Sequence, residues 1–166
     1  MAEQEQFHLD ILRQPDEMTC GPTCLQAVYR YFGDDLPLEQ VVAETPSLAE
    51  GGTLAVLLGC HALRRGYRAT IYTFNLDVFD PSWFEGEFAE AARKPKALET
   101  SDLIGKLESQ IVAKDLPKLR VASRAYIEFL QLGGKLRMQE LNAALLRRFL
   151  KRSTPILTGL SATYLY

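Results

Sequence analysis

The residues of this chain that are best suited to chemistry lie in one stretch, residues 14–24. Within it, Cys20 stands where a turn-forming loop meets a helix predicted over residues 20–32. Apolar residues repeat there with helical spacing, Pro22 suits a first helical turn, and Gly33 suits a helix end. A thiol at a helix N-terminus lies near the positive end of the helix dipole and near unpaired N–H groups, both of which favour the nucleophilic thiolate. The stretch therefore predicts a thiol nucleophile at Cys20.

A second polar residue of the same stretch complements this thiol. Gln14 precedes Cys20 by six residues, on the far side of a turn-forming Pro-Asp-Glu. A side-chain amide near the thiolate can donate a hydrogen bond to the oxyanion that forms when the sulfur attacks a carbonyl. Gln14 and Cys20 together predict a nucleophile and half of an oxyanion hole.

The pattern of Gln14, five residues, and Cys20-Gly21-Pro22-Thr23 before an amphipathic helix resembles the papain-like cysteine peptidases. Within that class it is similar to the C39 and C39-like group, which includes peptidases that remove double-glycine leader peptides from bacteriocin precursors. The resemblance continues through residues 51–53 and covers roughly the first 75 residues. It implies that Cys20 is the nucleophile, that Gln14 is the oxyanion donor, and that a peptide or protein is the substrate. It also implies a His as general base and an Asp or Asn that orients it, both on strands late in the chain.

Neither histidine of the chain matches that expected base. His61 falls on the apolar face of the helix predicted over residues 54–65, which favours a core position, although a neighbouring helix can in principle bring it to Cys20. His8 is expected at the surface. The chain ends at Tyr166, shortly after a buried strand predicted over residues 155–160. We therefore expect a truncated fragment of a longer chain that supplies the base, and the fragment itself is expected to be inactive.

The same residues allow three alternatives to peptide hydrolysis: a metal site, an acyl or peptidyl transferase, and a binding module. Cys24 is expected in the core, and the spacing of Cys20, Cys24, Cys60 and His61 does not suit a zinc site, so no metal and no cofactor are predicted. An acyl or peptidyl transferase of the phytochelatin synthase type shares the Gln and Cys-Gly residues. A non-catalytic module of papain-like fold that binds a peptide or protein is the third alternative.

Composition places limits on the class of protein. The chain has 166 residues, of which 47% are hydrophobic and 24% are charged, which suits one domain with a sizeable core. No apolar run reaches the length of a membrane span, and the N-terminus has no basic signal region, so a cytoplasmic protein without disulfides is expected. Residues 1–80 carry a net charge of −7 and residues 81–166 carry +5. The total of −2 gives no support to nucleic-acid binding, and the oligomeric state stays open.

The patterns and the resemblance together predict an α+β fold, papain-like and helix-rich, with an incomplete C-terminal antiparallel sheet. We expect a single domain over residues 1–166 in three parts: a nucleophile-bearing helical half (1–75), a helical segment or insertion (81–152), and the first strand of the C-terminal sheet (153–166). Helices are predicted over 20–32, 38–44, 54–65, 81–93, 103–112, 119–130 and 141–150. Strands are predicted over 7–11, 68–74, 135–137 and 155–160.

Overall fold

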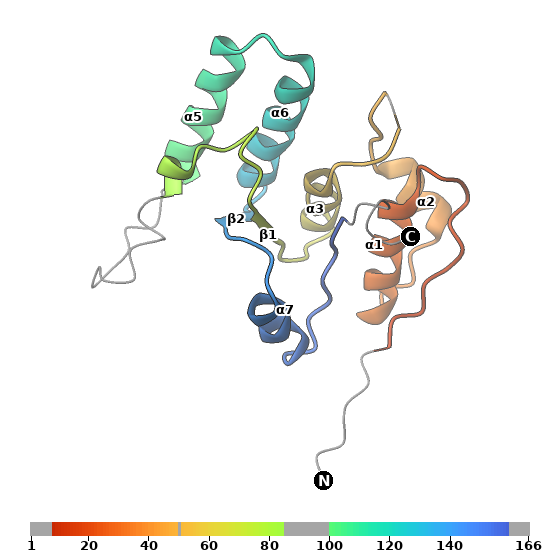
Figure 1. Cartoon of the computed structure of the whole chain (residues 1–166). Coiled ribbons are helices and arrows are strands. Elements are labelled where there is room, and N and C mark those ends of the chain that lie inside the picture. Colours follow the sequence, from red (N-terminus) through yellow and green to blue (C-terminus); the bar gives the residue numbers. More distant parts are fainter. Residues whose placement is uncertain (1–7, 50, 85–99, 160–166) are drawn as a thin grey trace. The chain divides into compact units, whose positions relative to one another are not determined.

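The computed structural model describes residues 8–49, 51–84 and 100–159 (Figure 1). The chain forms two compact units, one of residues 1–58 and 142–166 and the other of residues 59–141. The described residues of the first unit form helices and irregular segments, the two strands lie in the second unit, and the chain as a whole has α+β character. The division into three functional parts stays a prediction from the sequence.

The first unit contains the predicted nucleophile helix and two further helices. Its core consists largely of aliphatic side chains and one fully buried tyrosine, Tyr29. Gly33, at φ +78°, ends the first helix in the left-handed conformation, as the sequence predicted. Asn142 caps the last helix, because its Oδ1 accepts a hydrogen bond of 2.9 Å from the N–H of Leu145. The helices of this unit are α1 (Cys20–Tyr31), α2 (Leu38–Glu44) and α7 (Ala143–Leu150), and α1 packs against α2.

A third helix, α3 (Ala55–Arg64), runs from the first unit into the second. In the second unit β1 (Thr70–Thr73) pairs with β2 (Lys135–Met138) in parallel, with Thr70 opposite Lys135 and Thr73 opposite Met138. Parallel strands need a long crossover, and the chain between them provides the 3₁₀ helix η1 (Pro81–Phe84), α5 (Thr100–Ala113) and α6 (Pro117–Gln131). Figure 1 shows α5 and α6 side by side, and they pack against each other.

One aromatic ring organises the core of the second unit. Phe129 of α6 is fully buried, and two glycines lie directly against its ring. A Cβ added at Gly134 would lie 2.4 Å from Cε1 and Cζ of Phe129, and one added at Gly59 would lie 2.7 Å from Cε2. Close approach of the backbone to the ring is therefore the reason that these two positions hold glycine.

Several predicted elements differ from the structure. Residues 155–159 form no strand and are half-buried or exposed, so the prediction of a buried strand over 155–160 is wrong for these residues. Residues 8–14 form no strand either. The sheet of the described residues is parallel and has two strands, where an antiparallel sheet was expected. A helix was predicted over 81–93. Residues 81–84 form only the 3₁₀ helix η1, and residues 85–93 lie outside the described part.

The physical reason is that apolar composition alone does not say where a strand finds its partner. The stretch at 155–159 is β-rich in residue type, but the ladder that β1 needs is supplied by β2. Among the helices of the described residues, none has both the length and the apolar composition needed to traverse a bilayer.

Candidate functional site

The loop that precedes α1 is closed by its own hydrogen bonds. The N–H of Met18 donates to Oδ1 of Asp16 at 2.7 Å, which forms an Asx turn. The buried Thr19 hydroxyl donates to the carbonyl of Asp16 at 3.2 Å and accepts from its N–H at 3.3 Å. These local hydrogen bonds hold residues 16–19 in one conformation and so define where the loop ends and α1 begins, at Cys20.

Cys20 is the first residue of α1, and its side chain is exposed. Thr19 makes no side-chain cap, and its carbonyl accepts from both the N–H and the hydroxyl of Thr23, at 3.0 and 2.8 Å. Pro22 has no N–H, and the N–H groups of Cys20 and Gly21 have no acceptor within the helix. Two backbone N–H donors without a partner in the helix therefore lie at the start of α1, beside Cys20.

The three thiols of the chain lie in different environments. Cys24, one turn after Cys20, is half-buried, and its pKa is raised first by the loss of hydration and then by the charge at Cys20. Cys60 is 1% exposed, and burial, followed by the nearby Glu128, raises its pKa to about 11. Its Sγ donates to the carbonyl of Ala125 at 3.7 Å. Cys20 is therefore the most exposed of the three thiols, and the core position expected for Cys24 holds in part.

Gln14, the predicted oxyanion donor, lies in the irregular segment before the Asx turn and is exposed. No described residue forms a hydrogen bond with its side-chain amide. The side chain is therefore exposed to solvent, and its neighbours Arg13 and Pro15 lie beside Gln26 and Arg30 of α1.

The two histidines occupy the kinds of position that the sequence indicated. His8 is exposed, and His61 on α3 is 4% exposed, which confirms the core interpretation. His61 belongs to the second unit and Cys20 to the first, so the structure does not assign His61 as the general base, and the exposed His8 forms no hydrogen bond with Cys20. No group of three or more His, Cys, Asp or Glu side chains among the described residues is arranged to hold a metal ion.

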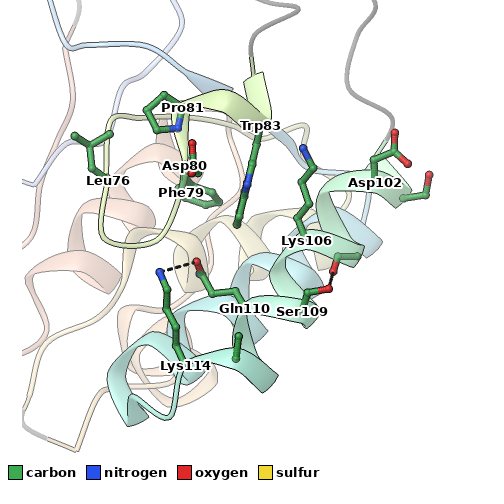
Figure 2. A pocket seen from close by; sticks show the side chains of 13 residues that line it. Leu76, Phe79, Asp80, Pro81, Trp83, Asp102, Lys106, Ser109, Gln110 and Lys114 are labelled. Atoms are coloured by element: carbon green, nitrogen blue, oxygen red, sulfur yellow. Dashed lines mark hydrogen bonds between the residues drawn. The ribbon is translucent and has the colours of Figure 1, made fainter.

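The second unit also contains a groove between residues 76–83 and α5, which no sequence pattern indicated (Figure 2). Its volume is about 980 Å³. Two neighbouring rows of α5 with i, i+4 spacing form its floor, and this spacing is the signal that identifies the floor in retrospect. One row is small, with Ser101, Gly105, Ser109 and Ala113, and the other is polar, with Asp102, Lys106 and Gln110 followed by Lys114 directly after the end of α5.

Polar contacts fix the shape of this groove. Gln110 donates through Nε2 to the carbonyl of Val78 at 2.9 Å and accepts from Nζ of Lys114 at 3.4 Å. Nζ of Lys106 lies 5.8 Å from the centre of the Trp83 ring, a cation–π distance (Figure 2). Hydrogen bonds from Ser82 lower the pKa of the exposed Asp80 carboxyl. Among the described residues that line the groove there is neither a thiol nor an imidazole, so it suits binding better than nucleophilic catalysis.

No protein-family model, curated protein or solved structure matches the chain significantly. The functional assignment therefore depends on the residues and their geometry.

Proposed function

We propose that the chain carries the nucleophile-bearing part of a papain-like cysteine peptidase of C39-like type, with Cys20 as nucleophile and Gln14 as oxyanion donor. The observation that carries the proposal is the contrast among the thiols. Cys20 is exposed at the N-terminus of α1, whereas burial raises the pKa of both Cys24 and Cys60. Cys20 is the most accessible of the three thiols, and it lies at the start of α1, where backbone N–H groups have no acceptor within the helix.

The proposed reaction begins when the Cys20 thiolate attacks the carbonyl carbon of a peptide bond. The oxyanion that forms accepts hydrogen bonds from the Gln14 side-chain amide and from a backbone N–H at the start of α1. Cleavage of the C–N bond releases an amine, which takes up a proton, and leaves an acyl-thioester on Cys20. Water then hydrolyses the thioester; attack by a second amine would instead give transfer, as in enzymes of the phytochelatin synthase type.

Labelling with a peptidyl epoxide tests the first step of this reaction without the need for a general base on the chain. We expect Cys20 to be alkylated in preference to Cys24 and Cys60, and the single variants Cys24→Ser and Cys60→Ser to be labelled as the wild type is. The variant Gln14→Ala is expected to slow labelling by a peptide aldehyde, which forms an oxyanion, by about 100-fold. Gln40→Ala, at an exposed glutamine of α2, is the matched control. Slow, equal labelling of all three cysteines would refute the proposal.

The alternative function is a non-catalytic module that binds a peptide or protein. The groove of about 980 Å³ on the second unit favours this alternative, because it combines an aromatic wall with lysines and has neither a thiol nor an imidazole among its described lining residues. Labelling of Cys20 that slows in Gln14→Ala but not in Gln40→Ala decides for the peptidase, and labelling that is equal in the two variants decides for the module.

A further inference from the structure

Two of the three thiols of the chain lie on consecutive turns of one helix. Cys20 is the first residue of α1, and Cys24 follows four residues later on the same helix. Residues at this spacing share one face, and the side chain of the later residue tilts towards the helix N-terminus, which here means towards Cys20. The electrostatics of the pair agree with this placement, because burial and, after it, the charge at Cys20 raise the pKa of Cys24.

The helix backbone at this spacing meets the distance requirement of a disulfide. Cα atoms four residues apart in an α-helix are separated by about 6.2 Å, inside the range of about 4.4–6.8 Å that disulfides span. Their Cβ atoms are about 1.5 Å further apart than a relaxed disulfide allows. Cys20 is the terminal residue of α1, and its N–H has no acceptor within the helix, so the first turn can supply this movement. The resulting bond is strained, and strained disulfides are readily reduced.

The two thiols differ in the way that a reaction in two steps requires. Cys20 is exposed, so an external oxidant reaches it first, whereas Cys24 is half-buried. Once Cys20 is bonded to another sulfur it carries no charge, so one of the two causes that raise the pKa of Cys24 disappears in the step in which Cys24 must react. The third thiol does not compete, because Cys60 is 1% exposed and its Sγ donates to the carbonyl of Ala125.

We propose that Cys20 and Cys24 form a reversible disulfide within α1 by exchange with a small-molecule disulfide of the glutathione type. The thiolate of Cys20 attacks one sulfur of the oxidant, so that a mixed disulfide forms and one thiolate leaves. The thiolate of Cys24 then attacks the Cys20 sulfur, and the second thiolate leaves. The two cysteines together lose two electrons and two protons, and the oxidant is reduced to two thiols. Such a bond is transient and regulatory, which agrees with a chain that has no structural disulfide framework.

The consequence for catalysis rests on the proposed function, whereas formation of the bond does not. In the oxidised chain Cys20 has no thiolate and cannot attack a carbonyl. A dithiol reductant restores it. The disulfide would therefore switch the proposed peptidase off reversibly.

Oxidation of the reduced full chain in buffers of glutathione and glutathione disulfide tests the proposal. The reaction is stopped with acid, the remaining thiols are alkylated, and tryptic peptides are weighed by mass spectrometry. Trypsin cleaves after Arg13 and Arg30, so one peptide carries both Cys20 and Cys24, and Cys60 lies on another. We expect the first peptide to lose both thiols without retaining glutathione, while Cys60 stays reduced at the same oxidant concentration.

Three variants separate the two steps. Cys24→Ser is expected to stop at the mixed disulfide, so that Cys20 carrying glutathione accumulates at least about tenfold above the wild-type level. Cys20→Ser is expected to react with the oxidant at least about tenfold more slowly than Cys24→Ser, because burial still raises the pKa of the remaining Cys24. Cys60→Ser is the matched control and is expected to be oxidised as the wild type is.

The proposal is overturned if the mixed disulfide persists in the wild type at the level seen in Cys24→Ser. It is also overturned if the peptide that carries Cys20 and Cys24 keeps both thiols, or if the disulfide joins Cys60 or a second copy of the chain. Labelling of the reduced chain with a peptidyl epoxide distinguishes this inference from the proposed function. Selective labelling of Cys20 without a disulfide refutes this inference alone, and the disulfide without selective labelling refutes only the peptidase.

Discussion

The clamp of Phe129 between two glycines permits a sharp test of the core of the second unit. In the variant Gly134→Ala, the added methyl would lie 2.4 Å from two carbons of the Phe129 ring, where ordinary contact begins at 3.4 Å. The ring must therefore move by about 1 Å in a fully buried position, and such overpacking costs about 1–3 kcal/mol. Alanine also restricts the unfolded chain, which offsets about 0.4–1 kcal/mol. We expect a net loss of about 1–2 kcal/mol in the free energy of unfolding.

Urea unfolding followed by far-UV circular dichroism measures this loss, together with a fall of about 3–6 °C in Tm. The control is Gly105→Ala in α5, where an added Cβ meets no atom within 4 Å and helix propensity predicts a gain of about 0.5–1 kcal/mol. Phe129→Leu introduced into Gly134→Ala removes the clash, so the two substitutions are expected to be non-additive by at least about 0.5 kcal/mol. An unchanged unfolding midpoint for Gly134→Ala, or strict additivity with Phe129→Leu, would show that the ring does not lie against the glycine.

Three further outcomes are expected. Asn142→Ala removes the N-cap of α7 and should lower the free energy of unfolding by about 1 kcal/mol in urea titrations, whereas Asn142→Asp keeps an acceptor and should cost less. Raising the pKa of Cys60 from 9.0 to about 11 leaves about 100-fold less thiolate at neutral pH. Iodoacetamide labelling of Cys60, followed by mass spectrometry, should therefore be far slower than that of a free thiol, and labelling at the rate of free cysteine would contradict this. Because the pKa of Cys60 is higher in the folded than in the unfolded state, the free energy of unfolding should fall as pH rises from 9 to 11. Gly51 has φ +93°, and Gly51→Ala adds a methyl 2.3 Å from Sδ of Met18; Gly52→Ala also has a positive φ but its added methyl contacts no atom within 4 Å. Gly51→Ala should therefore lower Tm more than Gly52→Ala does, and equal Tm values would count against the contact with Met18.

The helices of the first unit were predictable because their signals are local. Pro22 and Gly33 mark the two ends of α1, and the apolar spacing between them identifies the buried face, so the predicted helix over 20–32 agrees with Cys20–Tyr31. The helices predicted over 38–44 and 54–65 agree equally well with α2 and α3. The candidate nucleophile followed from the same signals, because a residue at a helix start is defined by the helix itself.

The arrangement of strands was not predictable in this way. The residue types predict short strands both at Lys135–Met138 and at residues 155–159, but only the first segment pairs with β1. A strand is stable only where another backbone satisfies its N–H and C=O groups. The antiparallel sheet expected from the family resemblance needs partners that the pattern of one segment cannot specify.

Chain order and local pattern alone determined that a cysteine begins an amphipathic helix, with a glutamine six residues before it. Only the tertiary structure decided that Cys60 is buried against Ala125 while Cys20 stays exposed, and that the buried Gln26 amide donates to the carbonyl of Leu36. The reason is physical: helix capping depends on neighbours a few residues away, whereas hydration and hydrogen-bond satisfaction depend on segments that are distant in the chain and meet only in the folded protein.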